Sequence, residues 1–290
     1  MTFLTQILNG IQIGSIYALV ALGYTMVYGI IKLINFAHGD IIMVGAYVTW
    51  YLIAKLYISE WAAIVLAVVG CTVLGMVIEK VAYKPLRKSA RISLLITAIG
   101  VSFLLENIAQ LIFTANPRMF TNLFPGNMNL GSLTIPNNTV VTILVSVALM
   151  VGLTLLVDKT KIGKAMRAVS EDNDTAQLMG INVNSTISFT FGLGSGLAAL
   201  AAVLYCCSYT QINPTMGSML GLKAFVAAVL GGIGSLPGAM DGGLVIGIAE
   251  SLTKGYVASS YADAIVFGIL IVVLLIKPTG FFGRTMNEKV

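Results

Sequence analysis

Residues 170–184, SEDNDTAQLMGINVN, form a polar segment between two long uncharged stretches. No Asp, Glu, Lys or Arg occurs from Met119 to Val157 or from Thr175 to Leu222. A helix of about 20 apolar residues is long enough to cross the hydrocarbon core of a bilayer. The two stretches therefore predict membrane-spanning helices, and the polar segment between them predicts a structure outside the lipid.

The whole chain has the composition of an integral membrane protein. Of its 290 residues, 57% are hydrophobic and only 10% are charged, and the mean hydropathy is +0.92. A soluble globular domain is far more polar. A transmembrane β-barrel is excluded because its strands alternate polar and apolar residues, whereas these segments are apolar on every face. We expect an all-α, polytopic membrane protein with about 8–10 transmembrane segments.

Apolar length and the positions of Gly, Pro and charged residues predict nine spans. The last three predicted spans are short for a full crossing, so we expect one or more broken or re-entrant helices. Residues 3–30 lack the basic n-region of a signal peptide and predict a retained helix. The nine spans are 5–30, 39–55, 62–80, 93–113, 138–157, 187–209, 220–233, 241–255 and 263–277.

The basic residues predict which loops face the cytoplasm, because Lys and Arg accumulate in cytoplasmic loops. Nine spans with the N-terminus outside and the C-terminus inside place thirteen of the 17 basic residues on one side, in a bacterial inner (cytoplasmic) membrane. This distribution, rather than nucleic-acid binding, accounts for the net charge of +5. The thirteen are Lys32, Lys80, Lys84, Arg87, Lys88, Arg91, Lys159, Lys161, Lys164, Arg167, Lys277, Arg284 and Lys289, and the other four are Lys55, Arg118, Lys223 and Lys254.

The polar segment itself predicts a short helix. Asp174 followed three residues later by Gln177 approximates a capping box, so the helix begins there or slightly earlier, at Ser170. Gly180 accepts a left-handed backbone and is expected to end the helix. Ala176, Met179 and Gly180 then share one face, which suits the groove of a partner. The alternative is a solvated loop whose charges only keep it out of lipid.

Resemblance to a known family favours docking. The heptapeptide DTAQLMG (174–180) resembles the cytoplasmic coupling motif of ABC importer permeases. Three longer stretches resemble the branched-chain amino acid permease family (the LivH type). One departure is TFGL at Thr190–Leu193, where the best-known coupling loops have Ile-x-Leu-Pro, which argues against the maltose-type subclass. The three stretches are ALGYTMVYGIIKLINFAHGDIIMVGAY (21–47), GKAMRAVSEDNDTAQLMGINVNSTISFTFGLGSGLAALAAVL (163–204) and INPTMGSMLGLKAFVAAVLGGIGSLPGAMDGGLVIGIAESL (212–252).

The resemblance implies a single transmembrane permease domain (1–290) with a cytoplasmic coupling loop at 158–186. It also implies a second related permease, two cytoplasmic ATPase subunits and an external substrate-binding protein. The cargo would be Leu, Ile or Val; urea or short amides, or an ATPase-independent carrier or channel, are the alternatives. No cofactor is expected, and the chain has no phosphate-binding G-x4-G-K-[ST] motif of its own. The expected ATPase-coupling residues are Glu171, Asp174, Ala176, Met179 and Gly180.

Charged and polar residues within the spans are candidates for the translocation pathway, because burying a charge in lipid costs about 2.5 to 3.5 kcal/mol. Glu106, beside Asn107, is expected in the outer half of its helix. Lys223 and Glu250 are also expected near the outer side. The first interpretation is a structural ion pair of Lys223 with Glu250 or Glu106, and the alternative is contact with an amino-acid substrate, which carries both charges.

His38 lies in the sequence NFAHGD at a helix boundary. The first interpretation is helix capping by Asn35, His38 and Asp40, and the second is gating. Catalysis is disfavoured because no nucleophile is evident, and a single histidine cannot assemble a multi-histidine metal site. Three cysteines, Cys71, Cys206 and Cys207, are expected to be small buried hydrophobic residues.

The run GGIGSLPGAMDGG (231–243) is expected not to continue as a helix, because Pro237 lacks a backbone donor and glycine lowers helix stability. One interpretation is a tight cytoplasmic re-entry. The other is a hinge at Gly234, Pro237 and Gly238 whose free backbone groups line the pathway.

Overall fold

The computed structural model describes residues 3–32, 34–87, 89–130 and 133–283. These residues are mostly helical, as the composition predicts. The helices are α1 (Phe3–Ile31), α2 (Ala37–Ala54), α3 (Glu60–Ile78), α4 (Arg91–Phe113), α5 (Asn137–Lys159), α6 (Lys161–Glu171), α7 (Asn173–Leu178), α8 (Val183–Ser208), α9 (Met216–Gly231), α10 (Leu236–Tyr256) and α11 (Ala262–Ile276). A π-helical turn (Glu79–Tyr83) and a 3-10 turn (Lys84–Leu86) extend α3, and a second 3-10 turn (Ser259–Tyr261) precedes α11.

Each of the nine predicted spans lies on one helix: α1 to α5 and α8 to α11. Six of the helical segments are long and apolar enough to cross a membrane, and they contain α1, α3, α4, α5, α8 and α11. Of the other three, α9 has 16 residues, or about 24 Å at 1.5 Å per residue, which is short of the roughly 30 Å hydrocarbon core. The chain is therefore a multi-pass helical membrane protein.

The predicted start of the eighth span, at 241, is wrong. Helix α10 begins at Leu236 and has 21 residues, so it is long enough for a full crossing. Pro237 lies in the first turn, where its missing N–H is not needed for a helical hydrogen bond. Ser235 caps this end, since its Oγ accepts a hydrogen bond from the backbone N–H of Gly238 at 3.2 Å.

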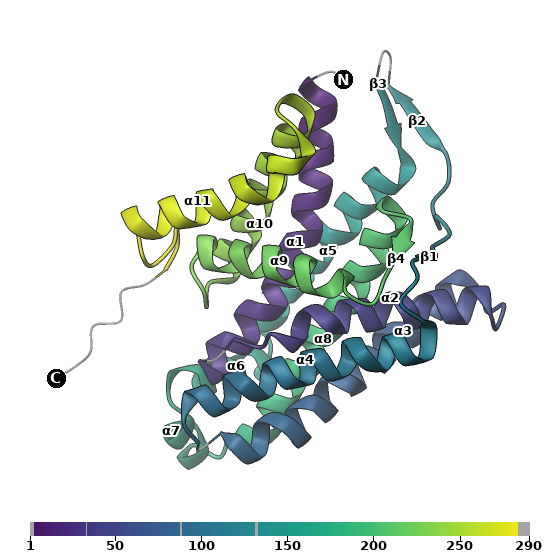
Figure 1. Ribbon diagram of the computed structural model, residues 1–290. Coiled ribbons are helices and arrows are strands. Elements are labelled where there is room, and N and C mark those ends of the chain that lie inside the picture. Colours follow the sequence, from purple (N-terminus) through teal and green to yellow (C-terminus); the bar gives the residue numbers. More distant parts are fainter. Residues whose placement is uncertain (1–2, 33, 88, 131–132, 284–290) are drawn as a thin grey trace.

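The connections between the spans gather at two opposite ends of the bundle (Figure 1). At one end, which we call the hairpin end, β2 (Asn127–Leu130) pairs with β3 (Leu133–Pro136). At the same end, β1 (Arg118–Met119) pairs with β4 (Gln211–Ile212), which joins two connections far apart in sequence. These pairings agree with the predicted order of crossings.

The other end, which we call the basic end, contains α6, α7 and the described residues of the connections at 32–36, 79–90, 232–235 and 277–283. Three hydrogen bonds fasten two of these connections to the ends of α8 and α9. Arg87 Nη1 donates a hydrogen bond to Asn184 Oδ1 at 2.8 Å. The N–H groups of Phe281 and Phe282 donate to the carbonyl oxygens of Leu230 and Gly231. Three of the basic residues assigned to this side, Lys88, Arg284 and Lys289, lie outside the described residues.

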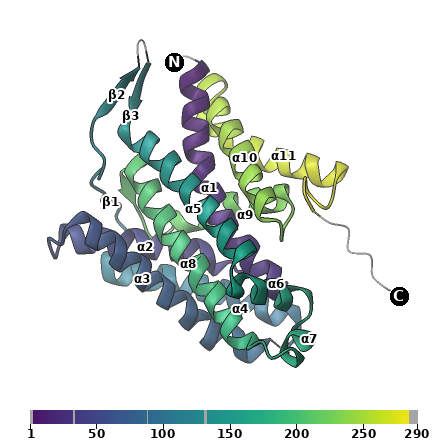
Figure 2. The same cartoon turned by 180° about the vertical axis from the view of Figure 1, so that it is seen from behind.

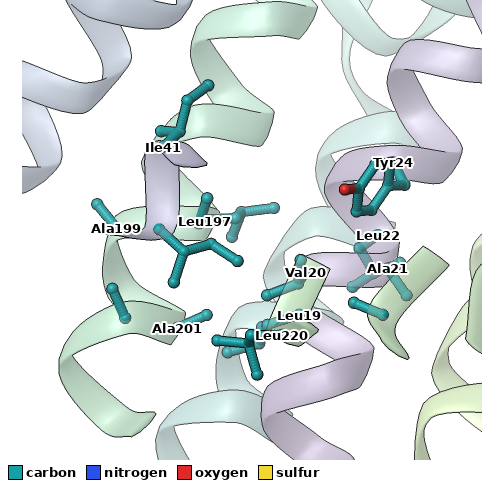
Figure 3. Close-up of a cluster of buried hydrophobic side chains, with 14 of the residues drawn as sticks. Leu19, Val20, Ala21, Leu22, Tyr24, Ile41, Leu197, Ala199, Ala201 and Leu220 are labelled. Carbon is teal, nitrogen blue, oxygen red and sulfur yellow. The ribbon is translucent and has the colours of Figure 1, made fainter. Parts of the chain in front are cut away.

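Helices α1 and α8 form the centre of the bundle, and α8 packs between α3 and α5 (Figure 2). Side chains from α1, α2, α8 and α9 meet in a core that includes Leu19, Ile41, Leu197 and Leu220 (Figure 3). By contrast, α4 and α11 expose large apolar side chains such as Leu111 and Leu275. This arrangement suits a bundle whose peripheral helices face lipid or another membrane subunit.

Close helix crossings depend on glycine. Gly14 of α1 and Gly247 of α10 pack so closely that a Cβ on Gly247 would overlap the backbone of Gly14. Similarly, Gly39 of α2 packs on Gly217 and Gly221 of α9. Small residues allow such approach between membrane helices, where packing replaces the hydrophobic driving force.

Candidate functional site

Two short helices, α6 and α7, lie together at the basic end, on the opposite side of the molecule from the β2–β3 hairpin (Figure 1). Helix α6 is amphipathic: Met166 and Val169 are buried, whereas Lys164 is exposed. Thr160 caps it, with Oγ1 accepting from the N–H of Gly163 at 3.1 Å. Sequence reasoning missed α6, although the three-residue spacing of Met166 and Val169 in a basic segment was a signal for it.

The predicted helix in the polar segment exists as α7, but its N-cap residue is two positions earlier than expected. Asp172, not Asp174, is the N-cap residue, and its Oδ1 accepts from the N–H of Thr175 at 2.7 Å. This hydrogen bond lowers the pKa of the Asp172 carboxyl below its usual value. The predicted capping box of Asp174 and Gln177 is therefore wrong. Asp172 caps the helix instead, and Asp174 lies in its first turn.

Gly180 ends α7 as predicted. Its φ is +83°, and the N–H of Ile181 donates to the carbonyl oxygen of Ala176 at 3.0 Å, while the N–H of Gly180 donates to that of Gln177 at 3.0 Å. This is the hydrogen-bond pattern of a Schellman cap, which requires a left-handed residue. The turn fixes the angle at which α7 leads into α8.

The exposed face of α7 differs from the expected one. Ala176 is buried, with 3% of its surface accessible, so it anchors α7 rather than facing a partner. Instead, Leu178 and Met179 are 88% and 79% exposed. The carboxylates of Glu171 and Asp174 are exposed in the same segment. The result is an apolar tip flanked by acidic residues, and Leu178 is the member that sequence reasoning missed.

Replacing Gly180 with Val is expected to destabilise the α7–α8 turn by about 1–2 kcal/mol, because a left-handed backbone is strained for a residue with a branched Cβ. No atom lies within 4 Å of the Cβ position, so steric overlap adds nothing. Hydrogen exchange of the amides in 172–182 should accelerate in Gly180→Val. Gly180→Asn, which tolerates this conformation better, is the control; equal exchange in all three proteins would contradict the account.

A polar network joins the start of α8 to the end of α3 at the basic end. Glu79 is completely buried and pairs with the Arg87 guanidinium and the Ser188 hydroxyl. Arg87 also bonds Asn184. Because Asn184 and Ser188 of α8 lie 97 and 109 residues from their partners Arg87 and Glu79, no spacing signal predicted the network. It couples the segment that follows α7 to the π-helical turn of α3, a kind of irregularity frequent at functional sites.

A cluster of charged side chains lies between α1, α9 and α10. Lys223 Nζ lies 2.9 Å from Glu250 Oε1, which confirms the predicted pair. Lys254 Nζ is 2.6 Å from the same oxygen, and the Tyr17 hydroxyl donates to Glu250 Oε2 at 2.6 Å. Asp263 of α11 approaches Lys223 at 2.6 Å. Lys254 could have been added from sequence, since it follows Glu250 by one helical turn.

Glu106 and Asn107 do not join this cluster, so the alternative pairing of Lys223 with Glu106 is wrong. Glu106 is buried and accepts a hydrogen bond from the Ser218 hydroxyl of α9. Asn107 is exposed on the outer surface of α4, and its Nδ2 donates to the carbonyl oxygen of Phe103 at 2.7 Å. Of the two, only Glu106 points into the bundle.

The predicted capping of α2 by Asn35, His38 and Asp40 is wrong. Phe36 is the N-cap residue, and no side-chain cap bond occurs in the described part of this turn. Asn35 instead accepts a hydrogen bond from the Tyr83 hydroxyl at 2.7 Å. His38 is buried with its ring 4.7 Å from that of Tyr24, and Asp40 is buried in the first turn of α2. These residues pack between helices, and their role in gating stays a hypothesis.

The glycine-rich run at 231–243 interrupts the helices as expected, but the interruption is shorter than the run because α10 begins at Leu236. Only 232–235 form a turn, in which Gly232 and Gly234 have φ near +99° and +98°. Pro237 and Gly238 are helical, and Gly238 contacts the backbone of Gly231. The structure is a tight re-entry. Among the described residues, no group of three or more His, Cys, Asp or Glu side chains could hold a metal ion.

Comparisons with known proteins agree with this architecture. Residues 6–275 match the family described as "Branched-chain amino acid transport system / permease component". The high-affinity branched-chain amino acid transport system permease protein LivH of Escherichia coli K12 is 45% identical, over 99% of this chain and 98% of that one. The corresponding permease BraD of Pseudomonas aeruginosa is 43% identical over the same shares.

A solved structure shares the fold. It is PsaBC from Streptococcus pneumoniae in complex with Fab, with a TM-score of 0.51 and 16% identity, covering 96% of this chain and 93% of that chain. The sequence resemblance is confirmed by matches that span almost the entire chain. This chain belongs to the branched-chain amino acid transport system permease family.

Proposed function

We propose that the chain is the membrane-spanning permease subunit of an ATP-driven ABC importer for Leu, Ile and Val. The observation that carries this proposal is 43–45% identity over almost the full length to LivH and BraD, which are named as branched-chain amino acid permeases. Residues 1–290 act as one transmembrane domain. The partners are a second related permease, two cytoplasmic ATPase subunits and an external substrate-binding protein.

The proposed orientation places the basic end in the cytoplasm of a bacterial inner membrane. Exposed basic residues in this region, including Lys164 and Arg167, support it, because positively charged connections stay on the cytoplasmic side. The hairpin end then faces the external binding protein. Segment 158–186 becomes the cytoplasmic coupling loop.

In the proposed mechanism, α7 transmits force from an ATPase to the bundle. Leu178 and Met179 insert into an apolar groove of the ATPase, and the neighbouring Glu171 and Asp174 contact its basic rim. Ala176 anchors α7, and the Gly180 turn passes motion into α8. Because Asn184 and Ser188 bond to Arg87 and Glu79, the end of α3 moves with the start of α8.

Changing both Leu178 and Met179 to Asp is expected to reduce leucine uptake at least tenfold. Burial of one such side chain contributes about 1.5–3 kcal/mol, and about 1.4 kcal/mol is a tenfold change in binding. Because both side chains are exposed in the chain itself, its folding should be unaffected. Uptake by proteoliposomes, co-purification of the ATPases and the unfolding temperature are the measurements.

The matched control is Gln177→Asp, which adds an acidic residue at an exposed position of the same helix. It should keep ATPase binding and uptake close to the parent values. Normal uptake by the double variant would overturn the coupling role of α7. Leucine uptake without any ATPase would favour a carrier, and ATP-driven uptake of urea or an amide but not leucine would change the cargo.

A further inference from the structure

A cavity of about 290 Å³ lies at the hairpin end between α1, α8, β4 and α9. Its wall includes Gln211 and Asn213 from the segment before α9, and Lys223 from α9 itself. From Thr215 to Lys223 the helix rises by about 12 Å, so the cavity extends from the connections at this end into the bundle. This volume is near the lower end of the range of about 300–1,000 Å³ for small-molecule sites, so there is space for one small organic molecule.

One side of the cavity is polar and charged. Lys223 and Tyr17 line it, and both bond to Glu250. The Lys223 ammonium has three N–H donors. Glu250 and Asp263 engage two of them in the described structure, which leaves the ammonium the capacity for one more hydrogen bond. The Tyr17 hydroxyl donates to Glu250, and its oxygen can still accept a hydrogen bond from a ligand ammonium.

A smaller part of the lining is apolar, and it shares a helix face with Lys223. Met216, Met219 and Leu220 come from one face of α9, at positions i, i+3 and i+4. Methionine is unbranched and adapts to differently shaped aliphatic groups. The cavity thus combines a largely polar lining with a smaller apolar patch, which suits a ligand that has both charged and aliphatic parts.

The charges around the cavity balance. Lys223 and Lys254 carry two positive charges, and Glu250 and Asp263 carry two negative charges. A ligand with a net charge would leave this cluster unbalanced, whereas a zwitterion would not. Urea has both donors and acceptors but no aliphatic part for the apolar patch.

We propose that this cavity is a binding site for one zwitterionic aliphatic amino acid, with its carboxylate at Lys223 and its side chain against Met216, Met219 and Leu220. The inference rests on the proposed function and deepens it, because it locates a cargo site inside the permease on the side where cargo is delivered. It also favours an amino acid over urea or a short amide as the cargo.

The first test fills the cavity without touching its charges. Met219→Trp is expected to lower ATP-driven leucine uptake by the assembled importer about tenfold, because the larger side chain occupies the space of the ligand and weakens its binding. The matched control is Leu222→Trp, on the same helix but not in the cavity wall, which should transport within about twofold of the parent. Equal transport by the two Trp variants would overturn the inference while leaving the proposed function intact.

The second test remains informative if the Trp variant fails to assemble. Met219→Cys in the assembled importer is treated with a membrane-impermeant thiol reagent, with leucine or urea present. The native cysteines are buried, so their background reaction is small. Leucine should slow modification of Met219→Cys severalfold, urea should not, and Leu222→Cys should respond to neither. Unaltered modification of Met219→Cys at saturating leucine would contradict a cargo site here.

Discussion

Replacing Glu250 with Ala is expected to lower the free energy of unfolding by about 3 kcal/mol, because it leaves buried positive charge without its counter-charge. Glu250 is 1% exposed and bonds Lys223, Lys254 and Tyr17. This value is at the lower end of the cost of removing one partner of a buried ion pair. Lys223 still has its ion pair with Asp263, and the Lys254 side chain is 33% exposed. The change is measured by heating the purified importer and using size-exclusion chromatography to determine how much folded protein remains at each temperature.

Two further variants separate a structural role from a transport role. Lys223→Met combined with Glu250→Met removes both charges of the pair and should recover most of the stability, because apolar replacement of a whole buried pair is often neutral. It should still fail to transport leucine if Lys223 holds the carboxylate. Asp263→Asn changes a half-exposed partner and should cost no more than about 1 kcal/mol. A Glu250→Ala protein as stable as its parent would refute the structural role.

The helical part of the fold was predictable because uncharged runs identify spans by length alone. All nine predicted spans lie on helices, even though α9 and α10 carry polar groups. The start of α10 was misplaced because glycine and proline were both taken as helix breakers. In the structure, Pro237 and Gly238 both lie in the first turn of α10, and a Cβ at Gly238 would overlap the carbonyl oxygen of Gly231.

In the candidate site, the local sequence predicted helix α7 and its end at Gly180, and a shared depth in the membrane predicted one contact. Lys223 and Glu250 were paired on that basis, and the structure confirms the pair. By contrast, the contacts of Glu79 with Arg87 and Ser188 depend on how α3 meets α8. Single-sequence periodicity carries no information about such neighbours. Burial of Ala176 within an otherwise exposed helix was missed for the same reason.

The crossing of α1 and α10 predicts the second large effect. Gly247→Leu is expected to lower the free energy of unfolding by at least about 3 kcal/mol, because overpacking at a backbone contact forces the helices apart. A Cβ at Gly247 would overlap the backbone of Gly14 and approach the Gly10 carbonyl oxygen at 2.6 Å. No rotamer avoids the clash, since it begins at Cβ. The yield of folded, monodisperse protein should fall sharply, and the unfolding temperature of the remainder should drop.

The appropriate control is Gly152→Leu in α5, where a Cβ meets no atom within 4 Å. Both variants replace a helical glycine with the same residue, so intrinsic helix propensity favours each by up to about 1 kcal/mol. Only the crossing differs between them. If Gly247→Leu folded as well as Gly152→Leu, α1 and α10 could not lie as close together as the structure places them. The charge cluster would then lose its basis too, because Tyr17 reaches Glu250 across this same crossing.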